Sequence, residues 1–171
     1  FNGYEIESLK ILESKSLKKP GTLINEDYTH FQISTIDYDI LLCKSFYKNL
    51  WEYCRLNNYS KLKKLLSEVD LDLEMKTKEG WNALIIAVYN DSIDCVNLLI
   101  NQKVNINAAN YNGTTVLMYA KENALNKGNT ILLDIILKNG ANLLSKDIYS
   151  KTVLDWLVKE NSQLYNYLKN K

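Results

Sequence analysis

Aliphatic residues recur at helical spacing in three short segments of the chain, and polar turns separate these segments. Residues 60–69, 93–101 and 130–138 each carry a paired aliphatic core on one predicted helix face. In the first segment, four aliphatic residues fall at positions i, i+3, i+4 and i+7: Leu62, Leu65, Leu66 and Val69. Gly140 is suited to the left-handed conformation just past the end of a helix. The pattern predicts three short helices, each followed by a tight turn.

The helical segments belong to a repeat with a period of 33 residues. Residues 80–84 recur as residues 113–117, with glycine at the start and leucine at the end of both. The next step, from Leu117 to Leu154, is 37 residues long. Four extra residues are therefore expected between residues 120 and 131. A fixed period of this length predicts stacked units, each of which contacts only its neighbours.

Four submotifs resemble the ankyrin-repeat family over roughly residues 44–168. They are the repeat opening at 78–87, the second helix at 94–100, the hairpin entry at 104–108 and the helix-to-hairpin turn at 139–142. The Thr-Pro-Leu-His tetrad of the family departs from its usual form, since it reads Asn82-Ala83-Leu84-Ile85 here. The resemblance implies an all-α repeat solenoid, built from helix-turn-helix units and hairpin loops, that binds another protein.

The period and the resemblance divide the chain into two parts. We expect a non-repeat N-terminal segment at residues 1–43 and an ankyrin-repeat domain at residues 44–171. The predicted repeats are 44–76, 77–109 and 110–146, followed by a terminal cap at 147–171. A helix over residues 37–57 should lead into the first repeat. Short strands are expected at 5–12 and 31–34, in a segment that should pack on the first repeat.

Aromatic and polar residues at the hairpin tips and first helices form the candidate partner-binding site. Trp81 occupies a position that points from the concave surface in the ankyrin family, and tyrosine and tryptophan are enriched in binding hot spots. The competing interpretation is that Trp81 packs beneath the N-terminal segment or that these aromatics are isolated. Trp51 and Trp156 are expected in the core. The candidate residues are Lys78, Glu79, Trp81, Tyr89, Asn90, Tyr111, Asn112, Glu122, Ile148 and Tyr149.

Composition and motifs offer little support for catalysis or metal binding. The net charge of +1 argues against a nucleic-acid or membrane-surface partner, and no apolar run approaches the roughly 20 residues of a membrane span. His30 is the single histidine and has no nucleophile motif beside it. Residues 70–74 lack the glycine and the distal glutamate of a calcium loop. We therefore expect no catalytic residue, no metal and no cofactor.

The cysteines and the first residue bear on the compartment. Cys43, Cys54 and Cys95 are odd in number and lack CxxC spacing, so reduced core cysteines in the cytoplasm are expected. Because the chain begins with Phe1 rather than methionine, export is the alternative.

The sequence therefore predicts a monomeric module that binds a folded protein. The bias toward Lys, Asn, Ile and Tyr is typical of an AT-rich genome and favours a bacterial source. An immunity protein that neutralises a toxin is the most specific hypothesis. A secreted effector that binds a host protein and a regulatory scaffold are alternatives. An enzyme with a cryptic site in the N-terminal segment, using Glu26, Asp27 and His30, is the rival class.

Overall fold

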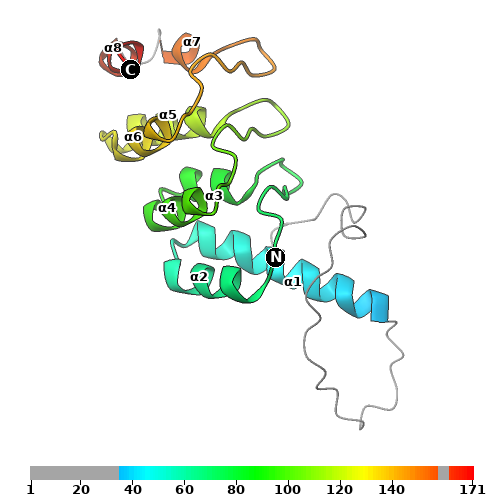
Figure 1. The fold of residues 1–171 in the computed structure, drawn as a ribbon. Helices are drawn as coiled ribbons and strands as arrows, with labels where there is room; N and C mark the ends of the chain where they lie inside the picture. The colour runs from blue at the N-terminus through cyan, green and yellow to red at the C-terminus, as the bar shows by residue number, and fades with distance from the viewer. Residues whose placement is uncertain (1–34, 158–161) are drawn as a thin grey trace.

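The computed structural model describes residues 35–157 and 162–171, with side chains from residue 42 onward in the first range and from residue 163 in the second. These residues form eight α-helices, arranged as four helix pairs stacked one above another (Figure 1). The helices are α1 (Thr35–Arg55), α2 (Tyr59–Glu68), α3 (Ala83–Tyr89), α4 (Ile93–Asn101), α5 (Val116–Lys127), α6 (Ile131–Lys138), α7 (Val153–Leu157) and α8 (Ser162–Lys169). The predicted all-α repeat solenoid is confirmed.

The helix boundaries follow the sequence period closely. Helix α4 has the predicted bounds. Helix α2 begins and ends one residue earlier than predicted, and α6 begins one residue later. Helix α1 begins and ends two residues earlier than predicted and runs across the expected boundary at residues 43 and 44. The domain bounds themselves stay predictions. The strands and the packing expected for the first 34 residues, and the candidates Glu26, Asp27 and His30, lie outside the described residues.

Residues one period apart occupy equivalent places in the core. The first helices α1, α3, α5 and α7 contact one another in that order. Large side chains at one repeat position are buried in three successive layers: Trp51, Leu84 and Leu117. Three residues further along each helix the side chains are small and fully buried: Cys54, Ala87 and Ala120. Small residues at this position let neighbouring first helices approach closely, so the period reflects a packing requirement.

The four extra residues lengthen the first helix of the third repeat. Helix α5 has 12 residues, whereas its counterpart α3 has seven. Four residues are about one turn of α-helix, and the added turn ends at Gly128, which has a φ of +68°. The Asn123 side chain donates a hydrogen bond to the carbonyl oxygen of Val88 in the preceding repeat. The insertion predicted between residues 120 and 131 is confirmed.

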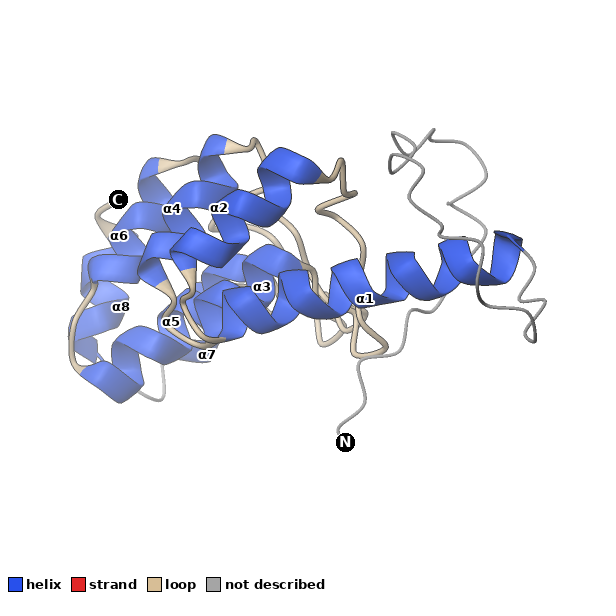
Figure 2. Ribbon diagram, turned by 90° about the horizontal axis from the view of Figure 1, so that it is seen from below, coloured by secondary structure: helices blue, strands red, loops and turns tan. Residues whose placement is uncertain are grey.

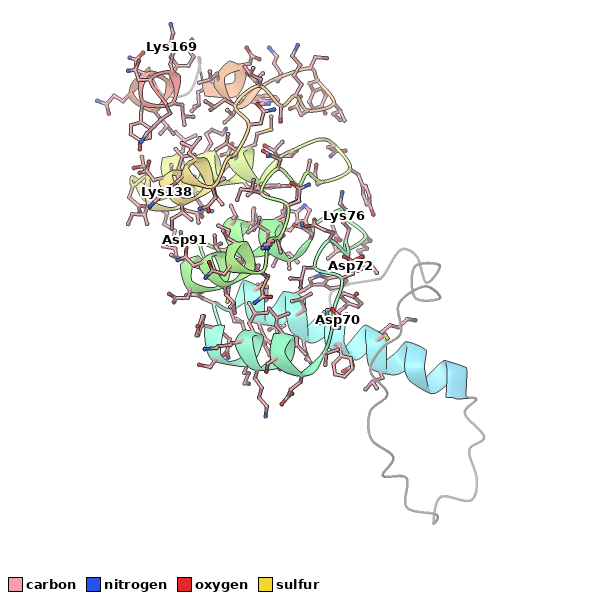
Figure 3. All side chains as sticks on the ribbon, viewed as in Figure 1. Asp70, Asp72, Lys76, Asp91, Lys138 and Lys169 are labelled. Atoms are coloured by element: carbon pink, nitrogen blue, oxygen red, sulfur yellow. The ribbon has the colours of Figure 1, made fainter. Side chains whose placement is uncertain are left out.

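The hairpin loops project from one side of the stack (Figures 1 and 2). Lys76 lies on this side, whereas Asp91 and Lys138 lie by the second helices at the opposite side (Figure 3). The loops are joined between repeats by polar side chains. The Asn107 Nδ2 donates to the Gly140 carbonyl oxygen at 3.2 Å, and the Asn142 N–H donates to Asn107 Oδ1 at 2.7 Å. These bonds fix the spacing of successive loops.

The last repeat is joined to the third by the Asp134 carboxylate of α6. This carboxylate accepts hydrogen bonds from the Tyr167 hydroxyl and from Thr130 Oγ1, and it pairs with Lys171 Nζ at 3.3 Å. Burial opposes its ionisation, but the hydrogen bonds from Tyr167, Thr130 and Lys171 outweigh that effect and lower its pKa from 3.8. Ionised Asp134 therefore stabilises the docking of α8.

We expect Asp134→Asn to lower the free energy of unfolding by less than about 1 kcal/mol near neutral pH, because the side chain is 41% exposed. A lowered pKa in the folded state gives a contribution that is present above pH 3.8 and lost as the pH falls through the folded value. Urea unfolding at about pH 7 and about pH 3 measures this difference. Equal losses at both values would contradict the assignment. Glu68→Gln, in the exposed pair with Lys64, is the control.

Candidate protein-binding surface

Three aromatic side chains pack against one another between the second and third repeats. We call Trp81, Tyr89 and Tyr119 the aromatic cluster. The ring centroids of Trp81 lie 4.8 Å from Tyr89 and 5.4 Å from Tyr119, and the two tyrosine rings are 6.0 Å apart. Tyr89 is 54% exposed, while Trp81 and Tyr119 are half-buried. The cluster is therefore a surface feature anchored in the fold, and Trp81 is not sealed in the interior.

Local structure fixes the position of each ring in the aromatic cluster. Trp81 precedes α3, and its carbonyl oxygen accepts a hydrogen bond from the Thr77 N–H at 2.9 Å. Tyr89 is the last residue of the same helix. The Tyr119 hydroxyl accepts a hydrogen bond from Asn110 Nδ2 at 3.0 Å. Burial raises the pKa of Tyr119, and hydrogen bonds with Trp81 and Asn110 only partly oppose this shift. The Tyr119 side chain is therefore held as a neutral phenol.

The hairpin tips repeat one local conformation. In each tip a side-chain oxygen accepts the backbone N–H two residues later, and the acceptors are Thr77, Asn110 and Asp147. Such turns favour short polar residues at the first position. Three turns also have a positive φ at their fourth residue: Gly80, Gly113 and Ser150. The same local chemistry therefore presents the next side chains of each tip in the same way.

The tips stack into the row that the period predicts. Gly80 faces Tyr111, since a Cβ atom on Gly80 would lie 2.6 Å from the Tyr111 nitrogen. The Ile148 N–H donates to the Asn112 carbonyl oxygen at 2.9 Å. Tyr111 is 52% exposed beneath the Lys76 ammonium, 5.5 Å from its ring centroid. The row thus leaves a line of accessible side chains beside the aromatic cluster.

A cleft of about 300 Å³ opens between the third and fourth repeats. We call it the repeat-junction cleft. Its walls come from hairpin tips and from helices α5 and α7. The lining residues are Asn112, Thr114, Met118, Tyr119, Lys121, Glu122, Asp147, Tyr149 and Trp156. Because Tyr119 belongs to both features, the cleft and the aromatic cluster form one continuous surface.

Lys121 is a buried charged residue at the wall of this cleft. Its side chain is 3% exposed, and its ammonium pairs with the carboxylate of Glu122, which is 52% exposed. One period earlier the same position holds Val88, which is fully buried. Burial of an ammonium is costly without a nearby negative charge. The pairing with Glu122 therefore allows a lysine at a core position and fixes the carboxylate beside the cleft.

Asp147 orients the aromatic walls at the other side of the cleft. Its Oδ2 accepts a hydrogen bond from the Trp156 indole at 2.8 Å, and its Oδ1 accepts the N–H groups of Tyr149 and Lys151. Burial opposes ionisation, but these hydrogen bonds outweigh it and lower the pKa of Asp147. The Tyr149 and Trp156 rings meet edge-on, with centroids 6.3 Å apart. Asp147 is therefore anionic at neutral pH and holds both walls.

The prediction that Trp156 belongs to the core is wrong. Trp156 is 38% exposed, and the buried residues of α7 are Val153 and Leu157. Trp156 lies at the edge of the helix face that Val153 and Leu157 form. The Tyr149 ring, from the hairpin tip of the same repeat, contacts it edge-on. The predictions for Trp51 and for the three cysteines agree with the structure, since all four side chains are buried.

The structure gathers seven of the ten candidate residues into the surface described above. Two lie in the aromatic cluster, three line the repeat-junction cleft, and two more stand on the row of tips: Trp81, Tyr89, Asn112, Glu122, Tyr149, Tyr111 and Ile148. Lys78 and Glu79 are exposed at the tip before Gly80. Asn90 differs, because its side chain donates to the Ile86 carbonyl oxygen at 2.8 Å at the end of α3. The role of the ten candidate residues in partner binding stays a prediction.

Sequence reasoning missed six lining residues of the cleft, four of which shape it as described above: Tyr119, Lys121, Asp147 and Trp156. A signal existed for the first two. Tyr119 and Lys121 stand one period after Ile86 and Val88, both of which are buried apolar residues. A large aromatic and a charged residue at core positions of a repeat mark a local departure from the common packing.

Comparison with known families agrees with this geometry. A family model described as ankyrin repeats, in three copies, matches residues 50–147, which is more than half of the chain. The stacked helix pairs define a repeat-solenoid protein, and the chain belongs to the ankyrin-repeat family. Ankyrin repeats are general protein–protein interaction modules, and proteins built from them are typically non-enzymatic. A search of curated proteins found no match.

Two further observations concern metals and membranes. Among the described side chains, no three His, Cys, Asp or Glu residues come close enough together to hold a metal ion. Within residues 35–157 and 162–171, no helix combines the length and apolar character that a membrane crossing requires.

Proposed function

We propose that this chain is a non-enzymatic module that holds a folded partner protein against its hairpin face. The hairpin face is the side of the stack that the hairpin tips and helices α3, α5 and α7 form. The aromatic cluster carries the proposal. Its three rings pack on one another while Tyr89 stays half exposed, so a partner can bury them with little loss of side-chain freedom. Rigid aromatic anchors of this kind supply much of the affinity in protein interfaces.

The context we favour is an immunity protein that neutralises a toxin in the cytoplasm as a monomer. The support is the Lys-, Asn-, Ile- and Tyr-rich composition together with three buried cysteines. A secreted effector and a regulatory scaffold would use the same hairpin face. The nature of the captured partner distinguishes them, since a toxin, a host protein and an endogenous enzyme differ in kind. An enzymatic site among Glu26, Asp27 and His30 is the alternative class.

The double variant Trp81→Ala/Tyr89→Ala tests the role of the aromatic cluster. We expect it to weaken partner binding at least tenfold, because truncated aromatic anchors commonly lose about 1.4 kcal/mol or more. The partner is first captured from a lysate of the source organism with the full chain, then purified and titrated by calorimetry.

Tyr59→Ala is the matched control for this experiment. Tyr59 is also an exposed tyrosine, but it begins α2, away from the hairpin face. It should leave affinity unchanged. Circular dichroism should show that both variants keep their helices. Unchanged affinity in the Trp81→Ala/Tyr89→Ala protein would place the partner elsewhere on the stack.

A further inference from the structure

The repeat-junction cleft combines aromatic walls with negative charge. Tyr119, Tyr149 and Trp156 supply the rings, and Glu122 and Asp147 supply the carboxylates. Aromatic faces attract cations through their quadrupole and repel anions. Tyrosine rings elsewhere in this chain already receive ammonium groups, as with Lys76 over Tyr111 at 5.5 Å. The chemistry of the cleft therefore selects a positively charged ligand.

Lys121, the cation among the described lining residues, does not reverse this preference. Lys121 is 3% exposed and is compensated by Glu122, whereas the Glu122 side chain is 52% exposed. An incoming group therefore meets the carboxylate before it meets the ammonium. Asp147 remains ionised at neutral pH because hydrogen bonds from the Lys151 and Tyr149 backbones and from Trp156 outweigh the effect of burial on its pKa. Among the described lining residues the accessible charge is therefore that of the Glu122 and Asp147 carboxylates, with the exposed Lys151 near Asp147.

The walls of the cleft are held in place before any ligand arrives. Trp156 is fixed by its 2.8 Å hydrogen bond to Asp147, and the Tyr149 ring stands at 84° to it. The Tyr119 hydroxyl is fixed by Asn110 at 3.0 Å. A preformed cage binds a planar cation with little ordering cost. The guanidinium of arginine is planar, stacks on aromatic rings and pairs with carboxylates through parallel N–H groups.

We propose that the repeat-junction cleft receives an arginine side chain of the bound partner protein. The proposal rests on the proposed function, because the cleft continues from the aromatic cluster through Tyr119. The aromatic cluster provides the apolar anchor, and the cleft selects partners that place an arginine next to it. Glu122 pairs with the guanidinium, the Trp156 ring stacks on one of its flat faces, and the Tyr149 ring, at 84° to Trp156, borders its edge.

A peptide titration tests the cleft without the natural partner. The probe is the blocked tripeptide acetyl-Gly-Arg-Gly-amide, with citrulline and glutamate analogues as comparisons. Citrulline keeps the shape of arginine and lacks its charge. The indole N–H of Trp156 in the nitrogen-15-labelled full chain reports binding, and Trp156→Phe identifies its signal. We expect a saturable shift with arginine and at least about fivefold weaker binding of both analogues.

A double variant removes the carboxylate and its paired ammonium together, so that the protein can still fold. Glu122→Gln alone would remove a carboxylate that pairs with the buried Lys121 ammonium, so we combine it with Lys121→Met. The double variant should bind the arginine peptide at least about fivefold more weakly, while Glu68→Gln on α2 should change nothing. Thermal unfolding checks that each protein is folded.

Several outcomes would overturn the proposal. Equal binding of the citrulline peptide, tighter binding of the glutamate peptide, an unchanged affinity in Lys121→Met/Glu122→Gln, or no movement of the Trp156 signal each exclude an arginine site. The two proposals fail separately. Partner capture that depends on Trp81 but persists without peptide binding refutes the arginine site alone. Peptide binding in a chain that captures no partner refutes the proposed function and leaves only the arginine selectivity of the cleft.

Discussion

Replacing Gly80 with alanine is expected to lower the free energy of unfolding by about 3 kcal/mol. Gly80 has a φ of +80°, a conformation that costs any residue with a Cβ atom about 1 kcal/mol or more. The added Cβ atom would also lie 2.6 Å from the backbone nitrogen of Tyr111 and 2.7 Å from its ring carbon Cδ2. A backbone atom cannot rotate away, so the second and third hairpin tips must separate.

Gly128→Ala is the matched control for the Gly80 prediction. Gly128 has a similar φ of +68°, but an added Cβ atom would meet no atom within 4 Å. Its expected loss is therefore only the conformational cost, about 1 kcal/mol. Urea unfolding followed by circular dichroism measures both values. Equal losses would show that contact between hairpin tips adds nothing to stability.

Replacing Asn82 with alanine is expected to cost about 2 kcal/mol. Asn82 is fully buried and caps α3, with its Oδ1 accepting the Ile85 N–H at 2.9 Å. Its Nδ2 donates to Glu74 Oε2 at 2.9 Å, and Glu74 Oε1 accepts the Asn105 N–H at 2.7 Å. Alanine would leave a helix end uncapped and would remove one member of a hydrogen-bond chain that joins the first and second repeats.

Asn82→Thr separates the cap from the rest of this effect. Thr115 stands one period later and caps α5, where its hydroxyl accepts the Met118 N–H at 3.3 Å. A threonine at position 82 can therefore restore the cap, and we expect a loss of only about 1 kcal/mol. The urea midpoints of the two variants give the comparison. A threonine variant as unstable as the alanine variant would show that the cap contributes little.

Much of the fold could be predicted from the sequence because each repeat buries the same positions. Leu84 and Leu117 are one period apart and both lie in the core. The longer step from Leu117 to Leu154 revealed an insertion of four residues in the third repeat. In the structure, α5 gains about one turn and ends at Gly128.

The candidate surface was less predictable, because it depends on departures from the repeat. Lys121 stands at a core position, where its ammonium pairs with the neighbouring Glu122 carboxylate. Tyr119 joins two parts of the surface that lie in different repeats, which no local motif reveals. Trp156 belongs to a short helix of five residues, where the period says little about burial. Side-chain pairing decided these three positions, between repeats at Tyr119 and within one repeat at Lys121 and Trp156.

The shared position of Tyr119 has a consequence for the fraying of the stack. In a linear array of repeats, terminal units open most easily because each is supported from one side. A partner seated on the aromatic cluster and in the repeat-junction cleft would contact the second, third and fourth units at once. Opening of the last unit would then also cost part of the binding free energy. Recognition and the cooperativity of unfolding would thereby be linked through one tyrosine.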